Sequence, residues 1–268
     1  MKIFLKYLFL IALVIVFVGP FYWLVSIALR ASGDIYSLRI IPENPTLMNF
    51  AETWQKFELW RPFVNSVMVA AAVLFLNILL SSLAAYPLAR LKFPGRDLIF
   101  FLLLSTMMIP FQLYMIPLFL TCLKLGLMNS LAGIVLPTSV GVFGIYLIKQ
   151  YYLTIPMDLE EAARIDGAGE FSIWWRIMFP LTKPAIATLS IFTFVGNWSN
   201  FLWPLIIIDR EDKYTLPIAI AKLSGAFIDK TQYLAAGSVI AIAPVIIIYL
   251  FMQRYFISGI SAGAVKGG

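Results

Sequence analysis

Six long intervals of this sequence contain no charged residue, and this pattern limits the folds that the chain can adopt. The intervals are 7–29, 62–89, 98–123, 125–148, 184–208 and 231–253, each 23 to 28 residues long. A helix needs about 20 apolar residues to cross the hydrocarbon of a bilayer. Strands of a membrane barrel would alternate apolar and polar residues, whereas these intervals are continuously apolar. We therefore predict an all-α, polytopic membrane protein with six transmembrane helices, because helices satisfy their own backbone polar groups in lipid.

The composition supports a membrane protein and excludes several kinds of chemistry. Hydrophobic residues make up 61% of the chain and charged residues 13%, against about 45–50% and about 25% in soluble domains. The chain has no histidine and a single cysteine, Cys122, which excludes histidine-based catalysis, histidine metal sites and an intrachain disulfide. The first apolar interval is longer than the 7–15 residues usual in a signal peptide. We expect it to be an uncleaved transmembrane helix.

The short loops predict the orientation of the chain in the membrane. Residues 89–97 form a very short connection between two spans. Three basic residues lie in it: Arg90, Lys92 and Arg96. Because short loops rich in Lys and Arg face the cytoplasm, we expect both termini and residues 149–183 to be cytoplasmic. Two segments then lie outside: 30–61, with a short helix near 50–57, and 209–230.

The net charge of +6 is scattered over loops on both sides, so a nucleic-acid surface is not expected.

Residues 149–183 form a polar insert between two apolar intervals. Thr154 as N-cap, followed by a proline and three acidic residues, predicts the start of a helix. Gly167 is expected to end that helix, since glycine readily adopts positive φ. Within it, Glu160 and Arg164 are spaced i,i+4 in the favourable order, which contributes about 0.3 kcal/mol.

A second short helix should follow the bend of the insert. It is expected to end before Pro180, and Thr182 with Pro184 should then begin the next span. Small residues surround the bend and would let another backbone approach closely: Ala162, Ala163, Gly167 and Ala168. From the residues alone, two interpretations remain open, a surface for a partner protein and an ordinary amphipathic helix at the membrane interface.

The insert also resembles a known motif. In sequence order, its residues are Glu161-Ala162-Ala163, then Asp166-Gly167-Ala168, then Ile177, Pro180 and Pro184. This pattern is similar to the EAA motif of ABC importer permeases. In that family the motif lies in a loop that docks into a cleft of the cytoplasmic ATPase subunit and transmits nucleotide-driven motion. The resemblance implies that the residues that couple this chain to an ATPase are Glu161, Ala162, Ala163, Asp166 and Gly167.

The resemblance extends over nearly the whole chain. Four segments resemble the sugar-uptake branch of these permeases, the maltose-permease type: 65–96, 108–119, 196–207 and 251–268. It implies three parts: an N-terminal helix with an extracytoplasmic segment (1–61), a type I importer transmembrane domain (62–257) and a cytoplasmic C-terminal tail (258–268). Related branches carry glycerol phosphate and other solutes, so a non-sugar solute remains an alternative.

Two absences from the sequence agree with a permease that uses energy from another subunit. The apolar intervals contain no ionisable Asp, Glu, Lys or Arg, whereas ion- or proton-coupled carriers generally need such groups at mid-membrane. The sequence also has no G-x-x-x-x-G-K-[ST] phosphate loop. We therefore expect no enzyme activity and no cofactor, with ATP and Mg²⁺ bound by a separate ATPase dimer. A coupled carrier is the alternative, and a structural membrane anchor a third class.

The family resemblance implies further partners and a location. Six helices are few to enclose a path for a sugar, so we expect a second, homologous permease subunit. A solute-binding protein should deliver the substrate from outside a bacterial-type inner membrane. By resemblance, the contact with that protein lies in the 209–230 segment. Its expected residues are Leu223, Ser224, Gly225, Ala226 and Phe227. A plain interfacial loop is the alternative for this segment.

Uncharged polar side chains inside the spans are the candidates for a solute path. Amides supply paired donors and acceptors, and aromatic faces cover the apolar faces of sugar rings, which suits a neutral polyol. The candidates are Gln112, Asn197, Trp198, Asn200 and Trp203. Hydrogen bonding between helices, worth about 0.6 kcal/mol per contact, is the alternative for each of them. Four interior prolines are expected to kink the spans: Pro110, Pro117, Pro204 and Pro244.

Overall fold

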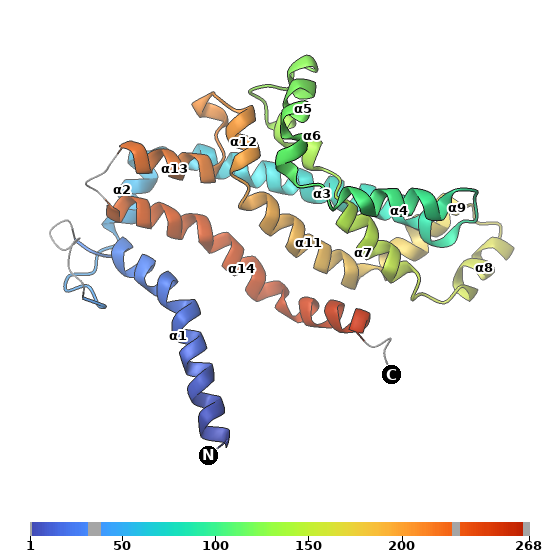
Figure 1. Ribbon diagram of the computed structural model, residues 1–268, viewed down its shortest axis with the longest axis horizontal. Helices are drawn as coiled ribbons and strands as arrows, with labels where there is room; N and C mark the ends of the chain where they lie inside the picture. The colour runs from blue at the N-terminus through green and yellow to red at the C-terminus, as the bar shows by residue number, and fades with distance from the viewer. Residues whose placement is uncertain (1, 32–38, 227–230, 265–268) are drawn as a thin grey trace. The chain divides into compact units, whose positions relative to one another are not determined.

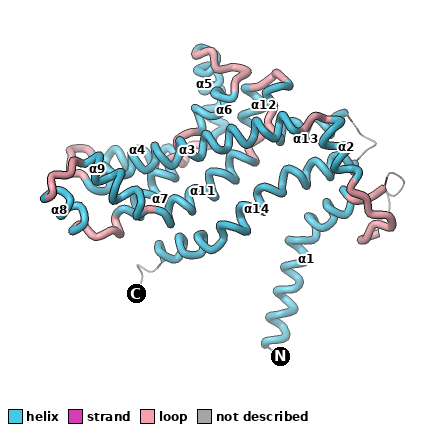
Figure 2. Tube along the Cα trace, turned by 180° about the vertical axis from the view of Figure 1, so that it is seen from behind, coloured by secondary structure: helices cyan, strands magenta, loops and turns pink. Residues whose placement is uncertain are grey.

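The computed structural model describes residues 2–31, 39–226 and 231–264, and the regular elements in these ranges are all helices (Figure 2). Three of them are long and apolar enough to cross a membrane: α1 (Lys2–Ala28), α3 (Trp60–Arg90) and α14 (Thr231–Ala264). Three pairs of shorter helices meet the same criteria if each bent pair is counted as one span, which gives up to six. The predicted all-α membrane fold is therefore confirmed.

Two of the bent pairs lie within intervals that we predicted as single spans, and the third joins the insert to the next span. The bend is 99° between α4 (Arg96–Thr106) and α5 (Phe111–Lys124), and 43° between α6 (Leu131–Thr138) and α7 (Val142–Tyr152). It is 76° between the helical stretch Glu170–Leu181 and α11 (Lys183–Trp198). Figure 1 shows the three pairs in green to orange. The kink expected at Pro110 is confirmed, and the third bend falls where the sequence predicted a new span to begin. The bend between α6 and α7 was not predicted.

Residues with weak helix preference explain the interruptions. Pro110, the N-cap of α5, has no N–H to donate and disfavours a helical residue before it. Gly141 precedes α7 in extended conformation. Of the other prolines that we expected to bend spans, Pro117 and Pro244 lie inside α5 and α14. Local sequence therefore overrides the apolar character of these intervals.

The interval 184–208 is interrupted at its polar cluster. Helix α11 ends at Trp198, and the short helix α12 (Leu202–Ile207) begins after three intervening residues. The N–H groups of Ser199 and Asn200 still bond to the carbonyls of Val195 (3.1 Å) and Asn197 (3.2 Å), but the helix does not continue. Pro204 cannot donate to the carbonyl of residue 200, and Asn side chains compete for backbone groups.

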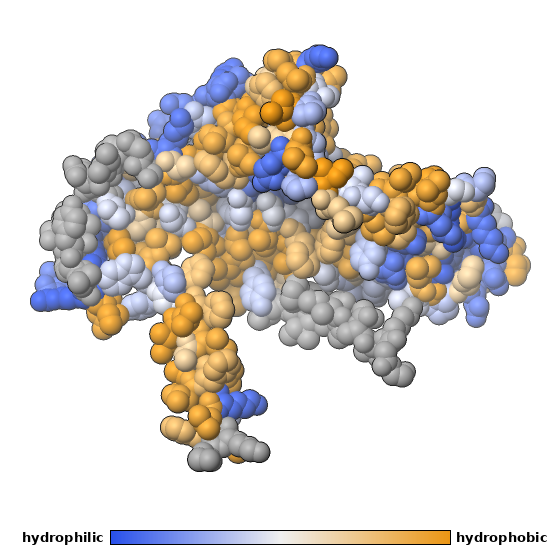
Figure 3. All heavy atoms as spheres, in the orientation of Figure 1, coloured by the Kyte–Doolittle hydropathy of each residue, from blue (hydrophilic) through white to orange (hydrophobic). Residues whose placement is uncertain are grey.

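The chain forms two compact units. The first comprises 1–64 and 214–246, and the second 65–213 and 247–268. In the first unit, helix α2 (Met48–Lys56) confirms the short helix expected near 50–57. Its Asn49 donates two 2.8 Å hydrogen bonds, to the carbonyls of Ala28 and Arg30 at the end of α1. Most of α1 itself is exposed apolar surface (Figure 3), as expected of a helix that faces lipid.

The second unit has an apolar core at the end that carries the polar insert 149–183. Helices α3, α7 and α11 and the helical part of the insert supply its buried side chains, which include Ala85, Ile148, Tyr152, Ile173, Met178 and Leu189. Helices α3 and α7 approach closely at Gly144, where a Cβ atom would lie 2.6 Å from Ser81 Oγ and 2.7 Å from Asn77 Oδ1. A side chain there would have to displace Ser81 or Asn77, so glycine favours this close packing.

Helix α14 runs to Ala264. It passes residue 258, where the sequence predicted the beginning of a C-terminal tail.

Candidate functional site

The polar insert contains helix α8 (Asp158–Ile165), which ends where the sequence predicted. Gly167 has φ +80°, and its N–H bonds to the carbonyl of Arg164 at 3.0 Å. The predicted start is wrong, because the N-cap is Met157. Thr154 instead serves the end of α7, where its hydroxyl donates to the carbonyl of Tyr151 at 2.7 Å.

The second helix of the insert continues further than expected. It consists of α9 (Glu170–Ile173), the π-helical turn η1 (Trp174–Met178) and α10 (Phe179–Leu181). The prediction that it ends before Pro180 is wrong. In a π turn, each hydrogen bond joins residues five apart rather than four. Pro180 follows the turn, so its missing N–H removes no α-helical bond from the turn. The predicted start of the next span is confirmed, since Thr182 is the N-cap of α11 and Pro184 lies in its first turn.

Helix α8 presents most of its side chains to solvent. Among its residues, all of which are described, Glu160 alone is buried. Ile165 is 87% exposed and Leu159 45% exposed. Together with the exposed residues of the motif, these form the α8 face: Leu159, Glu161, Ala162, Ile165 and Asp166. A face that combines apolar side chains with carboxylates is suited to a protein partner rather than to bulk water.

The remaining motif residues shape this face. Ala163 is partly buried and packs against the apolar core of the second unit, as does Ala168 after the bend. A Cβ atom at Gly167 would meet no heavy atom within 4 Å. A small side chain at this bend would therefore clash with nothing in this chain. Glycine is required there because of its positive φ.

A set of ionic contacts joins α8 to helix α3. Glu160 Oε1 lies 2.7 Å from Nε of Arg90, the last residue of α3, although the geometry is not that of a hydrogen bond. Glu160 Oε2 lies 3.3 Å from Arg164, which confirms the predicted i,i+4 pair. The contact with Arg90 was not predicted.

The contacts continue to the next helix of the insert. Arg164 Nε donates to Glu170 Oε1 at 2.8 Å, and the Tyr86 hydroxyl of α3 donates to Glu170 Oε2 at 2.6 Å. The hydrogen bond from Arg164, followed by that from Tyr86, lowers the pKa of the Glu170 carboxyl below its usual range. Glu170 is therefore an anion held between two helices of the same unit.

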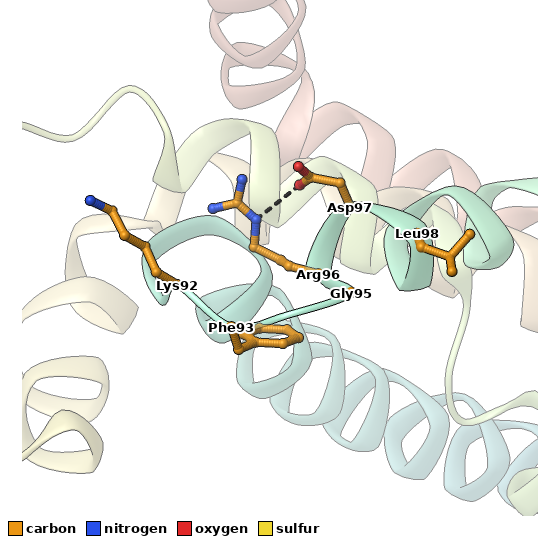
Figure 4. A pocket seen from close by; sticks show the side chains of 6 residues that line it. All are labelled: Lys92, Phe93, Gly95, Arg96, Asp97 and Leu98. Carbon is orange, nitrogen blue, oxygen red and sulfur yellow. Dashed lines mark hydrogen bonds and ion pairs between the residues drawn. The ribbon is translucent and has the colours of Figure 1, made fainter.

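The short basic loop before α4 borders a hollow of about 420 Å³ on the surface. Gly95 has φ +81°, which turns the chain into α4. Arg96 Nε donates to Asp97 Oδ1 at 2.9 Å. Figure 4 shows the Arg96 guanidinium turned towards this carboxylate and Lys92 extending away from the pair. The loop is therefore an exposed, partly neutralised basic turn, and it holds no cluster of unpaired cations.

The two tryptophans of the predicted solute path make contacts within the fold. Trp198 is buried, and its ring stacks on that of Phe194 with centroids 5.3 Å apart. Trp203 is also buried; its indole N–H donates to the carbonyl of Gly133 at 3.1 Å, and it meets the edge of Phe111 at 5.8 Å. These contacts bring α12 against α6 and α5.

The three amides of the predicted path lie in different settings. Asn197 donates to the carbonyl of Thr193 at 3.0 Å, one turn earlier in α11. Asn200 is partly buried in the break between α11 and α12, and Gln112 is exposed in the first turn of α5. The contact between Phe111 and Trp203 places the first turn of α5 beside α12.

The residues predicted to contact a binding protein fall at the end of helix α13 (Leu216–Ala226). Leu223 is buried, and its Cδ1 atom lies 3.4 Å from the position of a Cβ at Gly237 in α14. Ser224, Gly225 and Ala226 lie in the last turn of the helix. Phe227 lies outside the described residues.

These features define an integral membrane protein, with spans interrupted inside their apolar intervals and an exposed helix fixed between two of them. The chain belongs to the family described as "Binding-protein-dependent transport system inner membrane component", whose model matches residues 77–262. The membership that the EAA motif indicated is thereby confirmed. The protein is an inner-membrane component of a transport system.

Relatives and one solved structure agree with this assignment. The arabinooligosaccharides transport system permease protein AraQ of Bacillus subtilis is 37% identical over 97% of this chain and 94% of its own length. The melibiose/raffinose/stachyose import permease protein MelC of the same organism is 35% identical over 92% and 91%. A chain of a bacterial ABC transporter involved in alginate import superposes with a TM-score of 0.86 at 25% identity, and covers 95% of this chain and 97% of its own.

Proposed function

We propose that this chain is one permease subunit of an ATP-driven ABC importer, and that the importer carries a sugar or related polyol delivered by a solute-binding protein. The relatives that are named for oligosaccharide transport support the substrate class. Membership of the family removes the alternative of an ion- or proton-coupled carrier. A non-sugar solute such as glycerol phosphate is the remaining alternative, and uptake assays with labelled sugars distinguish it.

The exposed α8 face carries the proposal for energy coupling. It protrudes from the insert with Ile165 87% exposed, and its carboxylates, Glu161 and Asp166, are also exposed. We expect this face to dock with a separate cytoplasmic ATPase subunit, which binds ATP and Mg²⁺. The permease itself then hydrolyses nothing and moves in response to the ATPase.

The remaining parts of the assembly follow from the same function. A second permease subunit completes the path. Five residues contribute to the path on this side: Gln112, Asn197, Trp198, Asn200 and Trp203. The end of α13 and the residues after it, Leu223 to Phe227, meet the binding protein outside. Both termini and the α8 face then lie in the cytoplasm.

Substitution on the α8 face tests the docking. Ile165→Asp places a charge where the apolar contact should form, and Glu161→Lys reverses a charge beside it while keeping a good helix former. We expect both variants to insert normally, since the apolar spans drive insertion. Both should lose at least tenfold in co-purified ATPase and in uptake.

Lys92→Gln is the control, because Lys92 is an exposed charge that lies outside α8. It should behave as the wild type. Normal ATPase binding and uptake in both Ile165→Asp and Glu161→Lys would show that α8 is only an interfacial helix.

A further inference from the structure

The most deeply buried contact between helix α8 and the membrane domain is ionic. Its single buried residue is Glu160, whose side chain has no exposed surface, and the partner Arg90 is 4% exposed. Burying a carboxylate and a guanidinium costs several kcal/mol for each ion, and such a pair is often no more stabilising than apolar residues of the same size. A buried ion pair is thus an inefficient way to attach a short helix, but it is directional.

The ion pair belongs to a closed ring of contacts. The ring runs from Arg90 to Glu160, Arg164, Glu170 and Tyr86, with distances of 2.7, 3.3, 2.8 and 2.6 Å. Tyr86 and Arg90 are four residues apart on α3, so they lie on one face of that helix, one turn apart. The ring therefore begins and ends on the last turns of a single transmembrane helix.

Arg90 also holds the turn that precedes α8. Its second guanidinium nitrogen donates to the carbonyl of Ile155 at 2.5 Å. One arginine thereby fixes both the entrance to α8 and the buried carboxylate inside it. With two arginines and two glutamates, the ring is neutral, so it can move as one body without leaving an unpaired charge.

We propose that Arg90 and Glu160 are positioning residues that transmit displacement of α8 to the transmembrane helix α3. This inference rests on the proposed function, in which α8 docks with an ATPase. When the ATPase moves α8, the ring pulls the cytoplasmic end of α3 in the same direction. Glu170 carries the same displacement into the helical stretch that leads to α11.

Two sets of substitutions separate transmission from simple attachment. Glu160→Gln keeps the shape of the side chain and removes its charge. The double variant Arg90→Met with Glu160→Leu removes both charges and fills the site with apolar atoms, so that neither partner is left as an uncompensated buried ion. Lys92→Gln is the control, since it alters an exposed charge two residues from Arg90.

Each variant is purified with its ATPase, and uptake and ATP hydrolysis are measured in proteoliposomes. We expect both ring variants to bind the ATPase within twofold of the wild type. Uptake should fall at least tenfold, and the ATP hydrolysed per solute imported should rise at least fivefold. The control should leave all three quantities unchanged.

Three results would overturn the inference. Wild-type uptake in the double variant would show that any packed contact suffices and that the ring only attaches α8. This conclusion would stand even if Glu160→Gln alone failed to insert. Loss of ATPase binding in the double variant would show that the ring shapes the docking face. Unchanged uptake in both variants would remove any role. Failure of the proposed function itself is recognised separately, by normal ATPase binding in Ile165→Asp.

Discussion

The contact between α3 and α7 at Gly144 yields a quantitative prediction for Gly144→Ala. The added Cβ would lie 2.6 Å from Ser81 Oγ, 2.7 Å from Asn77 Oδ1 and 3.1 Å from Ser81 Cβ. Overpacking of this kind costs about 1–3 kcal/mol. Movement of Ser81 also breaks its 2.9 Å hydrogen bond to Asn77, one turn earlier in α3, worth about 0.5 kcal/mol. Alanine returns about 1 kcal/mol as a better helix former.

The net expectation is a destabilisation of about 1–2 kcal/mol, or a factor of about 5–30 in the ratio of folded to unfolded protein. The free energy of unfolding is measured by titrating the micelle-solubilised protein with SDS and following tryptophan fluorescence. Gly196→Ala is the matched control in α11, because a Cβ atom there meets nothing within 4 Å. It should be neutral or up to about 1 kcal/mol more stable.

The double variant Ser81→Ala with Gly144→Ala removes the shortest of the three contacts and should recover part of the loss. If Gly144→Ala is as stable as the wild type while Gly196→Ala behaves as expected, the close approach of α3 and α7 does not exist in the membrane. The packing derived for the second unit would then be wrong.

Two further predictions concern orientation and the solute path. In a Cys122→Ser background, Lys92→Cys should resist an impermeant thiol reagent in intact cells while Glu211→Cys is labelled, and the reverse pattern would place the α8 face outside and remove the basis for ATPase docking. Asn200→Leu should lower uptake at least tenfold or shift the apparent affinity for the solute while ATPase binding and basal hydrolysis persist, whereas unchanged transport would make Asn200 a packing residue.

The sequence was most informative where a single physical property decides the structure. Charge-free intervals long enough to cross a bilayer identified the membrane fold, because only a helix satisfies its own backbone there. The bend at Gly167 was predictable for a similar reason, since its φ of +80° strongly favours glycine over residues with a Cβ. The EAA motif located the insert by resemblance, and the family match confirms that resemblance.

Features that depend on competition between local preferences could not be predicted. The apolar intervals reveal length and polarity, but not whether a proline or an asparagine inside them ends a helix. Pro117 lies within α5, whereas Pro110 lies at a 99° bend. The same residue type thus has opposite outcomes, which tertiary packing decides.

The partner of Glu160 was missed for a different reason. Arg90 is 70 positions away in the sequence, and it was interpreted only as a marker of orientation. A signal was present, because Arg90 directly follows an apolar interval and Glu160 directly precedes the motif. Charges at such boundaries are candidates for pairing, but only the fold brings the two together, at 2.7 Å.

The length of α3 has a consequence for the lipid around the protein. Its 31 residues correspond to about 46 Å of helix, and its charge-free part to about 42 Å, against a hydrocarbon thickness of about 30 Å. To match the bilayer, that part would have to tilt by about 45°, beyond the range of about 0–40° in known spans. With less tilt, it extends into the interface. Hydrophobic mismatch therefore acts directly on the helix that carries Tyr86 and Arg90. A thinner or thicker bilayer would change the tilt of α3, so acyl-chain length becomes a physical variable of transport in its own right.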